Sequence, residues 1–163
     1  MEWLDSFWAT YSTLVLSVGT NVLLALSIYL TLACGMLTVA NAAFMAIGAY
    51  TAALLTAQTE MPLFPAVLLG SLLPASVALV IGIPTLRLSG VYLAMATLAF
   101  GEVVRIAILN AGSLTGGALG LNGIPQLTRG LDVAIAVAVA LYVLLRLAHS
   151  RVGRIMTAIR QDE

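Results

Sequence analysis

The sequence predicts an all-α protein, a polytopic transmembrane helix bundle with about five spans. Hydrophobic residues make up 61% of the 163 residues and charged residues only 9%, whereas a soluble domain carries roughly 25% charged residues. The mean hydropathy is +1.08. No residue from Ser6 to Thr59 is charged, and a helix needs about 20 mostly apolar residues to cross a bilayer. This run alone therefore predicts two membrane spans.

Breaks in the apolar pattern place the ends of the spans. Cys34-Gly35 divides the first long run in two, and the residue before Pro62 disfavours helix, which predicts a turn there. Pro74 lies inside the third span, where a membrane helix tolerates a proline and kinks. A glycine-dense segment, residues 111–130, separates the last two spans. The five expected spans lie near residues 11–33, 36–57, 63–86, 90–110 and 131–149.

Arginine residues predict the orientation, because the cytoplasmic flanks of membrane spans attract positive charge. Four arginines lie at or beyond the end of the last span, which places the C-terminus in the cytoplasm. Counted back through the five spans, the N-terminus and residues 111–130 are then outside. Arg129 is the exception, and Asp132 is its expected partner. The four cytoplasmic arginines are Arg146, Arg151, Arg154 and Arg160.

An enzymatic interpretation lacks the residues it needs. His149 is the one histidine and Cys34 the one cysteine, so the chain offers no paired-histidine haem or metal site, no internal disulfide and no complete nucleophilic site. The formal net charge of zero gives no sign of nucleic-acid binding. We therefore expect no catalysis, no metal and no cofactor in this chain, with membrane lipid and not nucleic acid around it.

Glu102 and Arg105 are the only charged residues well inside an expected span. At positions i and i+3 they lie on one helix face and can pair. Glu102 lies about 18 Å along the helix from Gly90, and a charge near the bilayer centre costs on the order of 2.5–3.5 kcal/mol. Two interpretations remain open, a structural pair between helices or a polar element of a substrate path. Asn41 and Asn110 are further candidates for such a path.

The second expected span is rich in small residues that recur every four positions. Such spacing lets membrane helices approach closely, so this span is expected to pack inside the bundle. It can also line a path, and the two interpretations are compatible. The pairs are Ala42 with Ala46, Gly48 with Ala52, and Ala49 with Ala53.

The glycine-dense stretch from Asn110 to Pro125 does not match a phosphate-binding loop. It lacks the Gly-Lys-Ser/Thr ending and the preceding strand that such a loop needs. We expect instead an irregular loop or re-entrant turn at the mouth of a pore. Membrane proteins allow such backbone only where protein or water covers it.

Residues 150–163 predict a cytoplasmic amphipathic helix. Val152, Ile155, Met156 and Ile159 recur at helical spacing on one face. This helix can rest on anionic lipid, which attracts each arginine with about 1 kcal/mol, or it can contact a partner protein.

Three stretches of the chain carry a family pattern. They are ANAAFMAIGAYTAALL (40–55), RLSGVYLAMATLAFGEVVRIAILNAGSLTGGALGLNGIP (87–125) and SRVGRIMTAIRQDE (150–163). Together they resemble the permease subunit of branched-chain amino acid ABC importers, and the second stretch, with Phe100-Gly101-Glu102 and Arg105, is the most specific. The sequence differs from many members at Ala40-Asn41, where these have Gly followed by His or Gln.

The resemblance implies an importer built from two related permeases, two cytoplasmic ATPases that bind the ATP, and a periplasmic or lipid-anchored binding protein that delivers leucine, isoleucine or valine. The permease lies in a bacterial or archaeal cytoplasmic membrane. A pocket for a leucine-like substrate would be mostly apolar, with a few polar groups for the amino and carboxylate ends. Alternatives are a urea or short-amide permease of the same family, an ATP-independent transporter or channel subunit, and a non-transporting scaffold.

The resemblance also assigns a role to the last fourteen residues. In the family, a segment like 150–163 is cytoplasmic and leads into an EAA-like motif that contacts the ATPase. Residues 1–163 are therefore expected to be the N-terminal part of a longer permease domain. The expected ATPase-coupling side consists of Arg151, Arg154, Arg160, Asp162 and Glu163.

Overall fold

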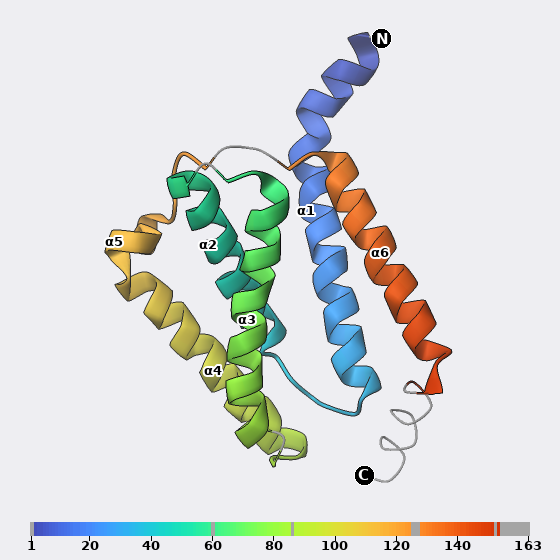
Figure 1. Ribbon diagram of the computed structural model, residues 1–163, viewed down its shortest axis with the longest axis vertical. Helices are drawn as coiled ribbons and strands as arrows, with labels where there is room; N and C mark the ends of the chain where they lie inside the picture. The colour runs from blue at the N-terminus through green and yellow to red at the C-terminus, as the bar shows by residue number, and fades with distance from the viewer. Residues whose placement is uncertain (1, 60, 86, 125–127, 152, 154–163) are drawn as a thin grey trace. The chain divides into compact units, whose positions relative to one another are not determined.

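The computed structural model describes residues 2–59, 61–85, 87–124, 128–151 and 153, and within these ranges it contains helices and loops but no strand (Figure 1). Five helices are long and apolar enough to cross a membrane. The predicted all-α fold with about five spans is confirmed. The helices are α1 (Glu2–Ala33), α2 (Asn41–Thr59), α3 (Leu63–Thr85), α4 (Gly90–Asn110), α5 (Gly112–Thr115), the 3₁₀ helix η1 (Gly117–Leu119) and α6 (Gly130–Ala148).

The start of α2 differs from the sequence prediction, which placed the second span from residue 36. Gly35 adopts a left-handed conformation with φ of 79° and closes α1, because its N–H donates to the Leu32 carbonyl at 3.0 Å. Residues 36–39 have no regular secondary structure, and the Thr38 hydroxyl accepts the Ala40 N–H at 3.2 Å. Only then does α2 begin, at Asn41.

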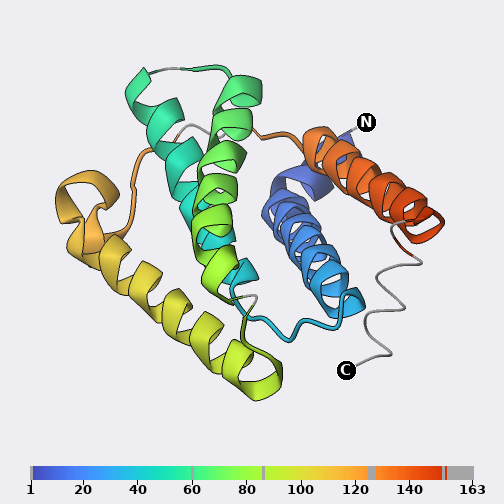
Figure 2. The same cartoon turned by 60° about the horizontal axis from the view of Figure 1, so that its bottom comes forward.

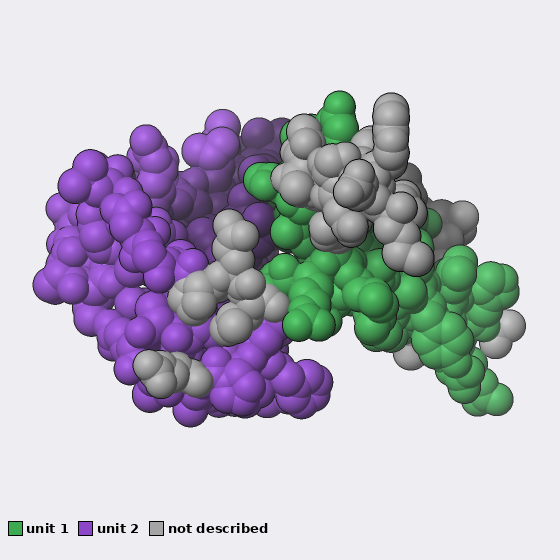
Figure 3. Space-filling model, turned by 90° about the horizontal axis from the view of Figure 1, so that it is seen from above, with its two compact units in different colours: residues 1–35, 128–163 green, residues 36–127 purple. Residues whose placement is uncertain are grey.

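The chain divides into two compact units, coloured separately in Figure 3. Unit 1, residues 1–35 and 128–163, contains α1 and α6, which lie side by side in Figure 1 and Figure 2. Gly19 of α1 lies directly against the Val133 side chain, where a Cβ has no room. Asp132 accepts a hydrogen bond from the Arg129 backbone N–H at 2.8 Å, so these two residues form a helix cap rather than the ion pair that the sequence suggested.

Unit 2, residues 36–127, contains the other helices, and α2 packs most extensively against α3. The closest approach joins two glycines, since a Cβ on Gly48 would lie 3.0 Å from the Gly70 carbonyl oxygen. Pro74 has no N–H to donate to that carbonyl, because proline breaks the i to i−4 hydrogen bond of a helix. The Gly70 carbonyl thus lies close to the α2 backbone at Gly48, in a crossing of the kind that small residues allow between membrane helices.

Two contacts join α4 to the beginning of α2. The Val39 N–H donates to Thr97 Oγ1 at 3.2 Å, and the rings of Phe44 and Phe100 lie 5.3 Å apart. Thr97 is buried and also donates to the Leu93 carbonyl of its own helix. The order of these contacts along the chain makes α2 and α4 parallel.

The glycine-dense segment is more regular than the sequence predicted, because α5 and η1 lie within it. Thr115 is buried, and its hydroxyl donates to the Ile108 carbonyl at 2.6 Å while accepting the Gly117 N–H at 3.3 Å. Gly116, with φ of 74°, ends α5 in a left-handed conformation that suits glycine. The segment is thus fastened to the end of α4.

Candidate functional site

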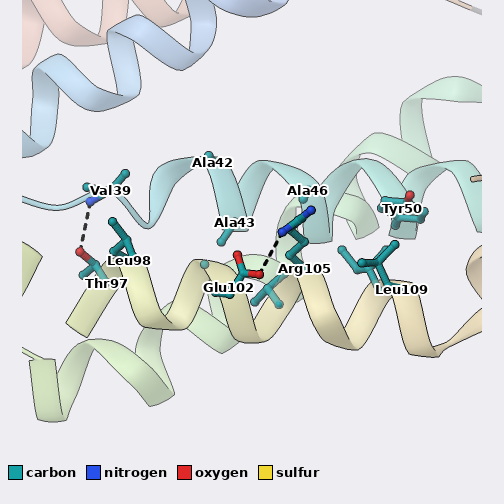
Figure 4. A pocket seen from close by; sticks show the side chains of 13 residues that line it. Val39, Ala42, Ala43, Ala46, Tyr50, Thr97, Leu98, Glu102, Arg105 and Leu109 are labelled. Carbon is teal, nitrogen blue, oxygen red and sulfur yellow. Dashed lines mark hydrogen bonds and ion pairs between the residues drawn. The ribbon is translucent and has the colours of Figure 1, made fainter. Parts of the chain in front are cut away.

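The candidate site is a cavity of about 480 Å³ between α2 and α4, inside unit 2 (Figure 4). This volume lies within the range of small-molecule sites, roughly 300–1,000 Å³. Its walls are mostly small and aliphatic. Among the lining residues are Ala42, Ala43, Ala46, Leu98, Ile108 and Leu109.

Helical spacing explains why these residues share one cavity. On α2 the lining positions Ala42, Ala46 and Tyr50 recur every four residues, and α4 presents a matching stripe that includes Gly101. The alanines of α2 are too short to fill the space between the helices. Gly101 adds to it, since a Cβ there would meet no atom within 4 Å. The helices are joined at the Thr97 end, and α5 contacts α2 as well, so the cavity lies between two points of attachment.

An ion pair lies on the α4 wall of this cavity. Arg105 Nη1 donates to Glu102 Oε1 at 3.0 Å, and Figure 4 shows both side chains directed from α4 towards α2. It is the one salt bridge within the described ranges. The side chains are 69% and 53% exposed for Arg105 and Glu102, so the two charges are available to a bound molecule.

The ion pair lies well inside a helix that can span the membrane. Glu102 lies in the second half of α4, a helix of 21 residues that is apolar enough to cross a membrane. Charged side chains at such depth face protein or a water-filled cavity, since lipid does not solvate them. The cavity can therefore offer both a cation and an anion within an otherwise apolar wall. In the described part of the chain, no group of three or more His, Cys, Asp or Glu could hold a metal ion.

The structure brings two of the four predicted path residues together. Glu102 and Arg105 pair and line the cavity. Asn41 is the buried first residue of α2, and Asn110 is the exposed last residue of α4, and neither is among the residues lining the cavity. A role of all four in a substrate path stays a prediction.

One residue of the predicted coupling side falls within the described ranges. Arg151 is exposed and follows the turn that ends α6. Arg154, Arg160, Asp162 and Glu163 lie outside the described residues, as do the apolar positions expected to form one face of the terminal helix.

Several residues of the site were not identified from the sequence, among them Thr97 and Tyr50. Thr97 ties the helices together, and Tyr50 lines both this cavity and a second one of about 230 Å³. Ala49, Ala53, Leu121 and Ile124 complete the second cavity. Helical spacing from Ala46 was the one signal available for Tyr50, and it does not distinguish a lining residue from a packed one.

Comparison with known proteins identifies the family. A family model described as the branched-chain amino acid transport system permease component matches residues 10–163. The high-affinity branched-chain amino acid transport system permease proteins LivM of Salmonella typhimurium and of Escherichia coli strain K12 are 33% and 32% identical to this chain. In each case the match covers 92% of this chain and 42% of the relative, so the chain spans less than half of their length. No solved structure matches significantly.

The resemblance found in the sequence is therefore confirmed. With its five apolar helices the chain is a multi-pass membrane protein. It belongs to the branched-chain amino acid transport permease family.

Proposed function

We propose that this chain is a translocating subunit of an ABC importer for branched-chain amino acids, and that the substrate passes through the cavity between α2 and α4. The observation that carries the proposal is the Glu102–Arg105 ion pair on the wall of an apolar cavity, within a helix long enough to cross the membrane. An apolar site with a few placed charges suits a small amino acid whose side chain is aliphatic. The names of the two LivM relatives, high-affinity branched-chain amino acid permease proteins, point to the same substrate class.

The second cavity suggests how the path continues. Tyr50 lines both cavities, and the second is covered by Leu121 and Ile124 of the glycine-rich segment. The path would run along α2 from the Thr97 end towards that segment, which the arginine distribution predicts to be outside. Irregular backbone at membrane depth is tolerated where it lines such a cavity.

The subunit itself performs no chemistry in this proposal. Two cytoplasmic ATPases would bind and hydrolyse ATP, a second, related permease would complete the translocation unit, and a periplasmic or lipid-anchored binding protein would deliver the substrate. The nucleotide state of the ATPases would bias the permease pair between inward-open and outward-open arrangements. Residues 150–163, with Arg151 exposed at their beginning, would face the ATPases from the cytoplasmic side.

The test is uptake of radiolabelled leucine by liposomes that contain the complete transporter. We expect uptake that requires both ATP and the binding protein. Uptake of urea or acetamide in place of leucine would reassign the substrate. Uptake driven by an ion gradient without ATP would indicate an ATP-independent transporter, and a purified complex without any flux would indicate a scaffold.

A further inference from the structure

The Glu102–Arg105 pair uses only part of its hydrogen-bonding capacity. A guanidinium carries several N–H donors and an ionised carboxylate several acceptor sites. Within the described ranges the pair shares a single hydrogen bond, at 3.0 Å, and neither side chain makes another. Since both side chains line the cavity and are more than half exposed, the remaining donors and acceptors are open to a ligand.

We infer that this pair holds the transported amino acid by its two charged groups, with the substrate carboxylate on Arg105 and the substrate ammonium on Glu102. The inference rests on the proposed function. An α-amino acid carries its two charges on neighbouring atoms, and the pair presents its own two charges side by side. The four charged groups then alternate in sign. A guanidinium also matches a carboxylate in shape, which favours Arg105 as the partner of the substrate carboxylate.

The apolar walls supply the other half of the recognition. Ala43 and Ala46 lie on the side of α2 that faces the pair (Figure 4), and an aliphatic side chain can rest against them. The ligand class is therefore a zwitterionic amino acid with an apolar side chain. A neutral amide offers no carboxylate to Arg105, and a simple carboxylic acid offers no ammonium to Glu102.

An ion pair that stays intact without ligand suits a site of passage. When the cavity holds no amino acid, neither charge is left uncompensated within the membrane. When the amino acid arrives, it adds its own charges to a pair that is already neutral. The gain in binding is then modest, and a path requires sites that release their substrate as readily as they take it up.

The test compares charge changes in the complete transporter, reconstituted in liposomes with its ATPases and binding protein. Glu102→Gln and Arg105→Gln are each expected to lower leucine uptake roughly tenfold to a hundredfold, as for the loss of a charged hydrogen bond. ATP hydrolysis stimulated by the leucine-loaded binding protein should persist. Val103→Ala is the control, because this exposed residue is on the same turn but does not line the cavity.

An exchange variant separates recognition from structure. Glu102→Arg combined with Arg105→Glu keeps an ion pair on the same helix face, so it preserves any structural role, but it reverses the positions of the two charges. We expect this variant to assemble at the wild-type level and leucine uptake to stay low. If the exchange variant does not assemble, Glu102→Asp tests the same point. The shorter side chain keeps its charge but places the carboxylate farther from the ligand, so leucine uptake is expected to fall.

Three results would overturn the inference. They are restored leucine uptake in the exchange variant, wild-type uptake in the Gln or Asp variants, and loss of stimulated ATP hydrolysis together with uptake in an assembled variant, which would place the pair in coupling. Absence of leucine uptake by the wild-type transporter would refute the proposed function itself, and the inference with it.

Discussion

The two faces of α2 use the same kind of residue for opposite purposes. On the face towards α3, Gly48 and Ala52 allow a crossing so close that a Cβ on Gly70 would lie 3.0 Å from the Ala52 Cβ. On the face towards α4, Ala42 and Ala46 line a cavity of about 480 Å³. The small side chains of α2 therefore allow α3 to pack in close contact, and they leave a space between α2 and α4.

The partner helix decides which of these outcomes results. α3 contributes a glycine and the released carbonyl beside Pro74, so its backbone can follow that of α2. α4 is joined to the beginning of α2 by the Phe44–Phe100 contact and by the Thr97 hydrogen bond, and beyond these contacts the cavity lies between the two helices. The α2–α3 pair is therefore the closely packed part of unit 2, and the α2–α4 pair is the part that leaves a cavity.

The largest expected effect is at the close crossing. Gly70→Leu places a branched side chain where even a Cβ is crowded by Ala52 and Gly48, and overpacking of this kind costs about 1–3 kcal/mol. We expect less assembled protein and a lower Tm in detergent. Gly82→Leu on the same helix is the control, because a Cβ there would meet no atom within 4 Å. Equal losses in the two variants would contradict the close crossing at Gly70.

The next effect concerns transport and leaves stability nearly unchanged. Ala46→Leu fills part of the cavity from the α2 wall, and a change of this size in an apolar site alters substrate discrimination by roughly tenfold or more. We expect leucine uptake by the complete transporter to fall at least about tenfold while the amount of assembled protein is kept. Ala99→Leu, at an exposed position of α4 outside the cavity, should leave uptake unchanged. If both variants transport equally well, the cavity does not carry the substrate.

The smallest effect concerns the tie between α2 and α4. Thr97→Val keeps the shape of the side chain but leaves the Val39 N–H without its acceptor, at a cost of about 1 kcal/mol. Unfolding in mixed micelles with increasing SDS would measure this change. Thr51→Val is the matched control, because its hydroxyl donates to the Ile47 carbonyl of its own helix. A difference near zero between the two variants would show that the tie adds no stability.

The fold could be predicted because its cause is local composition. Apolar runs of sufficient length predict spans, and the structure contains five such helices. The start of α2 could not be predicted, because residues 36–39 are as apolar as a helix would be. In the structure they form no helix, and the Val39 N–H donates instead to Thr97, a residue 58 positions away that no local pattern connects with it.

The candidate site could be predicted only in part. Spacing alone placed Glu102 and Arg105 on one helix face, and the structure pairs them. The cavity could not be predicted, because the alanines that line it and the Gly48–Ala52 pair that closes on α3 follow the same four-residue spacing. The cavity-lining alanines and the Gly48–Ala52 pair differ in the helix that lies opposite them, α4 or α3, and the tertiary structure determines which helix that is.

The most direct test of the central claim is the accessibility of Ala46 during transport. In a background in which Cys34, the one cysteine among these 163 residues, and every other cysteine of the reconstituted transporter are replaced by serine, Ala46→Cys and the control Val103→Cys would be treated with a positively charged methanethiosulfonate reagent. We predict that the cysteine at position 46 reacts, that leucine slows this reaction during ATP turnover, and that position 103 stays unmodified in lipid. A cysteine at position 46 that does not react, or whose reaction is unaffected by leucine, would contradict a substrate path between α2 and α4.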